Sequence, residues 1–417
     1  MKKTTLKLIA LSFLVLATLI GFIVFYSVHV VTDMPVEGHY LTLALRQGTY
    51  ADVIKHSIPR FQTDFGITCV VEEFSESGLR EAVLADAKRD VGVYDFCMVD
   101  GSWMAEYTAE NVLANLSELD YELDDDIIPA TKSICYQNGA LYLAPYYGNV
   151  TVLLYNKQLI KEAGYAPESM ESLDDILRIC RVTNKRHNLG FMYRGDTPNN
   201  IVVDFLPILL SFGGWVVDAD FNPTVNTTEF REALSFYLKL IKTGRAAQKD
   251  DLIAAVANCS AAVGIGWPGW YTPTRNSSMD YLALTGRVNG TSRAYNANIY
   301  GIWTVGIPEN SRHKEQAAML LRYLMDADVQ KETVAYGGVP CRYSSLKDTH
   351  VLEKFPQYEV VCKALENGVY RPVMEDWSEF YTILGGEMKR IISGEKSLLT
   401  GLSSAQVKLQ EMRQKEK

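Results

Sequence analysis

The stretch YLTLALRQGTYADVIKHSIPRFQTDFGITCVVEEF, at residues 40–74, alternates between two kinds of hydrophobic pattern. Two apolar strand patterns flank the spacing of an amphipathic helix, at residues 41–45, 50–65 and 67–74. The alternation continues with a predicted helix at 77–89 and a predicted strand at 94–99. Strands that alternate with helices of this length predict an α/β fold with a parallel sheet.

The ends of these predicted strands are the first place to expect a binding site. In parallel sheets, ligands bind beyond the carboxyl ends of the strands. Those ends are Gln47-Gly48-Thr49, the segment from Glu73 to Ser77, and the segment from Asp100 to Trp103.

A second lobe is predicted after the segment 142–148, where the pattern starts again. Ser172 followed by Asp174 and Asp175 is typical of a capped helix start with an acidic first turn. The further strands are expected at 150–155, 261–265 and 299–307. The further helices are expected from 156 to 164, at 172–183, 205–212, 228–243, 316–325 and 376–393, and from 398 onward.

Composition excludes one large class of partner. The 417 residues are 47% hydrophobic and 22% charged, with a formal net charge of -9. Because phosphate binding needs a basic face, a nucleic-acid partner is not expected.

The N-terminal segment has the character of an uncleaved signal-anchor at residues 1–32. Lys2, Lys3 and Lys7 precede an apolar run from Leu8 to Val31, long enough to cross a bilayer as a helix. Since positive residues stay inside, the rest of the chain is expected on the extracytoplasmic face of the membrane. A cleaved signal peptide is the alternative.

The seven cysteines all fall in the part predicted to be exported. Their number is odd and no C-x-x-C pair occurs, so neither a disulfide framework nor a zinc site is indicated. Buried free thiols are expected, and a single disulfide stays open.

Several blocks, in order, resemble one protein family. They are Tyr94-Asp95-Phe96 with Asp100, Asn138 to Tyr146, Leu154-Tyr155-Asn156-Lys157, Ser211-Phe212-Gly213-Gly214, Ala261 to Trp270, Trp303 to Pro308, and Arg371-Pro372. The chain resembles the extracellular solute-binding proteins of bacterial ABC importers, in the group that binds maltose and other sugars.

The resemblance implies a two-lobed, periplasmic-binding-protein-like fold of type II. The expected N-lobe is 40–146 with about 297–340, and the expected C-lobe is 147–296 with about 341–417. It further implies a monomer that binds a sugar between the lobes and delivers it to an ABC permease, with no catalysis, metal or cofactor.

The candidate ligand-binding residues combine flat rings with planar polar groups. A sugar presents an apolar C–H face and a rim of hydroxyls, so aromatic rings suit the face and polar side chains suit the rim. Trp267 and Trp270 flank a Pro-Gly turn, where core packing is hard to supply. The full set is Asp100, Trp103, Tyr146, Trp267, Trp270, Tyr271, Trp303, Arg342, Arg371 and Tyr381, with Glu73 and Glu76 as further rim candidates.

Other functions have weaker support in the sequence. Gly264-Ile265-Gly266-Trp267-Pro268-Gly269 matches G-x-G-x-x-G, but the prolines and indoles prevent the helix that a dinucleotide site needs. No catalytic histidine or nucleophile motif is present, although a glycoside hydrolase needs only two carboxylates and leaves no motif. The alternatives that stay open are a receptor for a non-sugar solute, a tethered sensor and a glycoside hydrolase.

Overall fold

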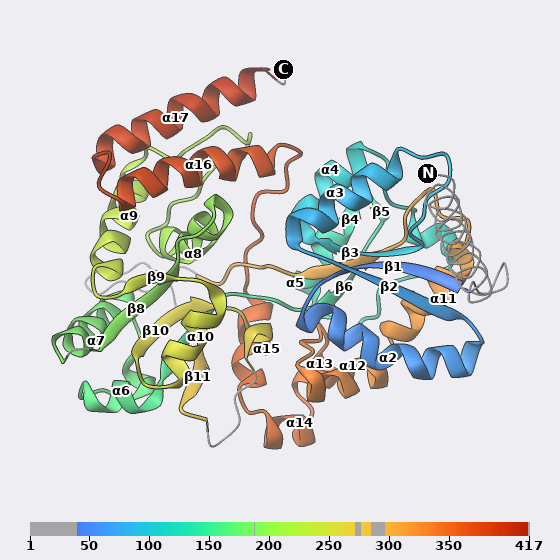
Figure 1. Cartoon of the computed structure of the whole chain (residues 1–417), viewed down its shortest axis with the longest axis horizontal. Helices are drawn as coiled ribbons and strands as arrows, with labels where there is room; N and C mark the ends of the chain where they lie inside the picture. Colours follow the sequence, from blue (N-terminus) through green and yellow to red (C-terminus); the bar gives the residue numbers. More distant parts are fainter. Residues whose placement is uncertain (1–39, 187, 272–276, 285–296, 416–417) are drawn as a thin grey trace, which may run out of the picture.

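The computed structural model describes residues 40–186, 188–271, 277–284 and 297–415 (Figure 1). The predicted signal-anchor at residues 1–32 lies outside the described residues. Within the described ranges, no helix combines the length and apolar character needed to cross a membrane.

The described residues fold into two α/β lobes, each built on a sheet with five described strands (Figure 1). The first sheet has the order β2-β1-β3-β12-β6, with β1 parallel to both β2 and β3 and β12 antiparallel to its neighbours. Its strands are β1 (Tyr40–Arg46), β2 (Thr68–Phe74), β3 (Phe96–Asp100), β6 (Ala144–Tyr147) and β12 (Trp303–Gly306), and a hairpin of β4 (Tyr136–Gln137) and β5 (Ala140–Leu141) lies beside it.

The second sheet has the order β11-β7-β10-β8-β9. Strand β10 is parallel to β8 and antiparallel to β7, so the sheet is mixed. Its strands are β7 (Val152–Asn156), β8 (Leu189–Arg194), β9 (Arg245–Ala247), β10 (Ala261–Gly266) and β11 (Met279–Leu282).

Helices cover both sheets because each carries one apolar face. Around the first sheet lie α2 (Thr49–Phe65), α3 (Glu76–Ala87), α4 (Met104–Ala109), α5 (Pro129–Lys132), α11 (Lys314–Leu324), α12 (Ala327–Thr333), α13 (Tyr343–Leu346), α14 (Thr349–Lys354) and α15 (Tyr358–Glu366). Around the second lie α6 (Lys157–Glu162), α7 (Leu173–Lys185), α8 (Pro198–Ser211), α9 (Thr228–Ile241), α10 (Lys249–Ala257), α16 (Trp377–Ile392) and α17 (Leu398–Lys415).

Most predicted elements are confirmed, including the Ser172 cap, whose hydroxyl accepts a hydrogen bond from the N–H of Asp175. Two bounds differ. The predicted strand 299–307 shrinks to β12, since the residues before it cross between the lobes. Helix α8 begins at Pro198, well before residue 205, because Thr197 caps a polar first turn that the apolar pattern does not include.

The lobe bounds also differ from the expectation at one place. Helices α13 and α15 pack against α12 and α5, on the side of the first sheet, whereas the sequence assigned residues after 341 to the second lobe. Apolar periodicity identifies the buried face of a helix but not the lobe that this face covers.

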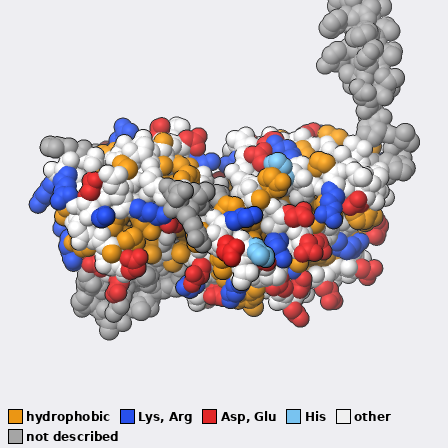
Figure 2. All heavy atoms as spheres, turned by 90° about the horizontal axis from the view of Figure 1, so that it is seen from below, with side chains coloured by type: hydrophobic (Ala, Val, Ile, Leu, Met, Phe, Trp, Pro, Cys, Tyr) orange, Lys and Arg blue, Asp and Glu red, His pale blue; other side chains and the backbone are white. Residues whose placement is uncertain are grey.

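Three segments cross between the lobes, at 147–152, 297–303 and 367–376. They hydrogen-bond to one another: the N–H of Thr151 donates to the carbonyl of Ile299 (2.9 Å), and the N–H of Tyr300 donates to the carbonyl of Val369 (2.9 Å). The crossings therefore form one narrow paired connection. Figure 2 shows two separate masses with a furrow between them, and acidic side chains gathered on this face over the first lobe.

All seven cysteines are free thiols. Cys69 and Cys259 are partly exposed and the other five are buried. Burial raises the pKa of the Cys97 thiol to about 12, which keeps it protonated.

Candidate binding site between the lobes

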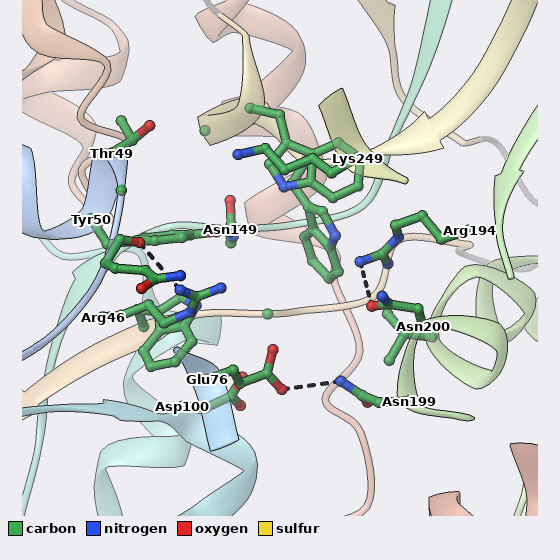
Figure 3. Close-up of a pocket in the computed structure, with 18 of the residues that line it drawn as sticks. Arg46, Thr49, Tyr50, Glu76, Asp100, Asn149, Arg194, Asn199, Asn200 and Lys249 are labelled. Atoms are coloured by element: carbon green, nitrogen blue, oxygen red, sulfur yellow. Dashed lines mark hydrogen bonds between the residues drawn. The ribbon is translucent and has the colours of Figure 1, made fainter. Parts of the chain in front are cut away.

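A cavity of about 370 Å³ lies between the lobes, within the size range of small-molecule sites. Its walls come from the carboxyl ends of strands in both sheets, from the helix starts that follow them, and from the crossings (Figure 3). The first lobe and the crossings contribute Arg46, Gln47, Gly48, Thr49, Tyr50, Glu76, Asp100, Asn149, Gly301, Trp303 and Arg371. The second lobe contributes Arg194, Asp196, Asn199, Asn200, Val203, Lys249, Trp267, Gly269 and Trp270.

Three indoles line this cavity, and each is held by close packing. Trp303, on β12, packs edge-to-face against Trp103 with ring centroids 5.5 Å apart. Trp267 lies against Gly301 of a crossing, where a Cβ atom would be only 2.6 Å from the indole ring. Trp270 ends the short turn Pro268–Trp270, and the guanidinium of Arg194 lies over its ring at 4.9 Å from the centroid.

A buried ion pair joins the first lobe to a crossing. Asp100 and Arg371 are only 4% and 7% exposed, and Nη2 of Arg371 lies 2.5 Å from Oδ1 of Asp100. The same oxygen accepts hydrogen bonds from the N–H (2.9 Å) and the hydroxyl (2.8 Å) of Ser102. Asp100 therefore caps the following turn and anchors Arg371.

Glu76 faces the second lobe from the start of α3. Its carboxylate accepts a hydrogen bond from Nδ2 of Asn199 on α8 (3.0 Å), which is a direct link between the lobes (Figure 3). Burial raises the pKa of Glu76, and the charge of Asp100 raises it further, while Arg371, Arg46 and Arg194 act in the opposite direction. The carboxyl group of Glu76 therefore lies inside the cavity, where it forms a hydrogen bond to the opposite lobe.

Tyr50 and Asn149 form a second polar pair. Nδ2 of Asn149 donates to Oη of Tyr50 (2.8 Å). Burial raises the pKa of Tyr50 to about 12, although the bond from Asn149 lowers it in part. The phenol therefore keeps its proton at neutral pH and can donate it to an acceptor.

Arg194 is fixed by a buried partner behind the cavity wall. Its Nε lies 3.1 Å from Oδ1 of Asp204, and Nη1 donates to Oδ1 of Asn200 (2.6 Å). Asp204 is 1% exposed, and this buried partner holds the guanidinium of Arg194 over the ring of Trp270.

The structure brings together six of the predicted residues. Asp100, Trp267, Trp270, Trp303 and Arg371 line the cavity, as does the rim candidate Glu76. Their position is established, and their role in binding stays a prediction.

The other predicted residues lie outside the cavity wall. Trp103 supports Trp303 from behind, and Tyr381 packs against Trp377 with centroids 5.9 Å apart. Tyr146 is 3% exposed on β6, while Tyr271 and the exposed Glu73 do not line the cavity among the described residues.

Arg342 has a different place from the one expected. It is 1% exposed in the first lobe, where Nη1 lies 2.7 Å from Oδ2 of Asp124 and Nη2 donates to the carbonyl of Met325 (2.6 Å). These partners use its guanidinium, so Arg342 ties the segment before α5 to the end of α11.

Sequence reasoning missed the polar residues of the second lobe. Arg194 ends β8, and Asn199 and Asn200 belong to the first turn of α8. The strand-end argument that found Asp100 did not reach Arg194, because no strand was predicted at residues 189–194. Arg46, Tyr50, Asn149 and Lys249 were likewise missed, although Gln47 to Thr49 had been identified as a strand end.

Comparisons with known proteins agree with this architecture. Two α/β lobes with a polar, aromatic cavity between them define the class of solute-binding proteins. The family model for the bacterial extracellular solute-binding protein matches residues 42–331. The chain belongs to this family, and the predicted membership is confirmed.

Individual relatives are distant in sequence. "Probable amino-acid ABC transporter periplasmic-binding protein y4oP" of Sinorhizobium fredii is 22% identical over 304 residues, which cover 68% of this chain and 69% of that protein. A structure titled as maltose-bound T. maritima MalE3 has a TM-score of 0.79 at 20% identity, covering 90% of this chain and 100% of the other. An ABC transporter solute-binding protein from Agrobacterium radiobacter K84, in complex with ribitol, has a TM-score of 0.78 at 22% identity, covering 91% and 100%.

Proposed function

We propose that this protein captures a sugar or a related polyhydroxylated compound between its lobes and presents it to an ABC permease. The observation that supports this most is the cavity itself, where three indoles stand beside Glu76, Asp100 and Asn149. Indoles suit the apolar face of a sugar, and planar carboxylate and amide groups suit its hydroxyls. The maltose and ribitol named with the two similar structures fit the same chemistry.

The proposal includes the place of the protein and the absence of turnover. The binding domain would stand on the extracytoplasmic face, tethered through the apolar segment at residues 8–31. Binding would draw the lobes together around the crossings, and the closed form would be the one that a permease recognises. The chain would act as a monomer that releases its ligand unchanged.

A ligand screen tests the proposal. The full-length protein, in a detergent without a sugar headgroup, is heated with neutral sugars, sugar alcohols, sugar acids and amino acids. A ligand at about 100 times its Kd stabilises the folded state by about 2.7 kcal/mol, which raises the Tm by several degrees. Stabilisation by a polyhydroxylated compound that chromatography recovers unchanged is the expected result. Stabilisation by amino acids alone, the ligand class named for the S. fredii relative, would contradict the proposal.

A further inference from the structure

Among the described residues, the cavity wall carries four cationic side chains, and two of them have close carboxylate partners. Arg371 pairs with Asp100 at 2.5 Å, and Nε of Arg194 lies 3.1 Å from Oδ1 of Asp204. These two guanidinium groups are neutralised by the protein itself. The other two cations are Arg46 and Lys249, and neither has a close buried carboxylate partner among the described residues.

Arg46 has unused hydrogen-bonding capacity. Among the described residues, no carboxylate lies within ion-pair distance of its guanidinium. Nη1 donates only to the carbonyls of Gln47 (3.3 Å) and Phe74 (3.5 Å), and Nε is buried with no hydrogen-bond partner in the described part of the chain. A guanidinium offers five N–H donors in a planar fork that suits a carboxylate or a phosphate.

Lys249 brings a second cation from the opposite lobe. Its Nζ lies 3.9 Å from Oδ1 of Asp250, an exposed neighbour with a side chain 93% accessible. An exposed pair at this distance is weak. In the view of Figure 3, Lys249 extends from the second lobe toward the side of the cavity where Thr49 lies.

The start of helix α2 adds a favourable environment for negative charge. Gly48 precedes this 17-residue helix with φ 86° and no side chain caps it. The first intrahelical bond runs from the N–H of Asp52 to the carbonyl of Gly48 (3.0 Å), so the N–H groups of Thr49 and Tyr50 have no partner within the helix. The free N–H groups and dipole of a helix start favour an anion.

One further group at this wall lacks a partner. Asn149 is 3% exposed, and its Oδ1 accepts no hydrogen bond from the described residues, while Nδ2 is used by Tyr50. A free amide oxygen suits a hydroxyl donor. Acceptors for hydroxyls therefore stand next to donors that have capacity left for an anion. We call Arg46, Thr49, Tyr50 and Lys249 the cationic corner.

We propose that the ligand is a polyhydroxylated compound with one anionic group, a carboxylate or a phosphate, which binds at the cationic corner. Its hydroxyls contact Glu76, Asn149 and the indoles. This inference rests on the proposed function and narrows its ligand class. A hydrogen bond to a charged group is worth about 1.5–3 kcal/mol, which corresponds to about 10- to 100-fold in Kd.

Calorimetric titration of the full-length protein with matched ligands tests this inference. D-Glucose is compared with D-gluconate, D-glucuronate and glucose 6-phosphate, and ribitol with ribonate and ribitol 5-phosphate. At least one acid is expected to bind about tenfold tighter than its neutral counterpart. The carboxylate and phosphate arms then show which anion the corner accepts.

Two charge variants locate the effect. Arg46→Gln and Lys249→Gln are each expected to reduce the preference for the acid over the neutral compound by about fivefold or more. Arg89→Gln removes an exposed arginine that does not line the cavity and is the control. The Tm of each unliganded variant shows that it is folded.

The possible outcomes separate the two proposals. If the neutral compounds bind as tightly as the acids or more tightly, the proposal of an anionic ligand is wrong. The proposed function would be unaffected by this result. A preference for the acid that persists in both variants would also contradict the proposal, because the cationic corner would then not cause that preference. Binding of amino acids alone, or of no polyhydroxylated compound, would overturn the proposed function itself.

Discussion

Glu76 lines the cavity, and its burial there has a cost in stability. Its pKa is raised mainly by burial, so the folded state holds this proton more strongly than the unfolded chain does. Between the ordinary carboxyl pKa of about 4.3 and the raised value, the folded state therefore binds more protons. Stability must fall as pH rises through this window, and the full cost is present above it.

Replacing Glu76 with Gln should remove this dependence. We expect the free energy of unfolding of E76Q to fall less than that of the unchanged protein between about pH 4 and about pH 7. The Gln side chain can still accept the bond from Asn199. Urea unfolding at a series of pH values measures the difference, with the exposed Glu73→Gln as control. Parallel curves for E76Q and the unchanged protein would mean that Glu76 is not desolvated in the fold.

Single residues also show which parts of the candidate site could be predicted from the sequence and which could not. Asp100, Trp267, Trp270, Trp303 and Arg371 were predicted from strand ends, a Pro-Gly turn and family resemblance, and all five line the cavity. Arg342 shares the chemistry of Arg371, yet its partners Asp124 and Asp126 lie more than two hundred residues away in sequence, at separations of 218 and 216. Sequence shows the chemistry of a guanidinium, but only the fold decides which carboxylate neutralises it.

At the scale of elements, the paired crossings position the indoles. Gly301 lies in the second crossing, and its N–H donates to the carbonyl of Asn149 in the first (2.9 Å). Its missing side chain leaves room for the ring of Trp267. Helix and strand patterns predicted the elements on both sides but not this contact, because it joins segments without a regular period.

A single methyl group at this contact should be costly. In Gly301→Ala the new Cβ would lie 2.6 Å from the ring of Trp267, and overpacking of this kind costs about 1–3 kcal/mol. Gly386→Ala is the matched control, since no atom lies within 4 Å of a Cβ at this position on α16. The control should be neutral or stabilising by up to about 1 kcal/mol. Urea unfolding compares the two, and equal stability would show that Trp267 does not press on the crossing.

At the scale of the whole molecule, the described lobes face each other through few direct bonds. The bond from Asn199 on α8 to Glu76 on α3 joins the lobes across the cleft. The three crossings connect the described lobes covalently and lie together. A molecule of this design can open by bending the crossings while each lobe keeps its own core.

Removal of the hydrogen bond between Asn199 and Glu76 should destabilise the closed form selectively. Asn199→Ala is expected to weaken ligand binding by about 2- to 13-fold, which corresponds to the net hydrogen-bond contribution of about 0.5–1.5 kcal/mol. Asn226→Ala is the control, since its bonds to Ser403 and Arg231 stay within the second lobe. Small-angle scattering should show that ligand reduces the radius of gyration of the protein. In the Asn199→Ala variant, this reduction should need a higher ligand concentration. No change in the radius at saturating ligand would contradict closure.

The distribution of the free thiols makes this motion accessible to spectroscopy. Cys69 lies on β2 of the first lobe and Cys259 follows α10 of the second, and these are the two cysteines with partial exposure. The natural chain thus carries one partly exposed thiol on each lobe as an attachment point for a donor and an acceptor fluorophore. Because burial raises the pKa of the Cys69 thiol to about 12, its coupling needs alkaline pH. The interlobe distance can then be followed in single molecules without engineered labelling sites.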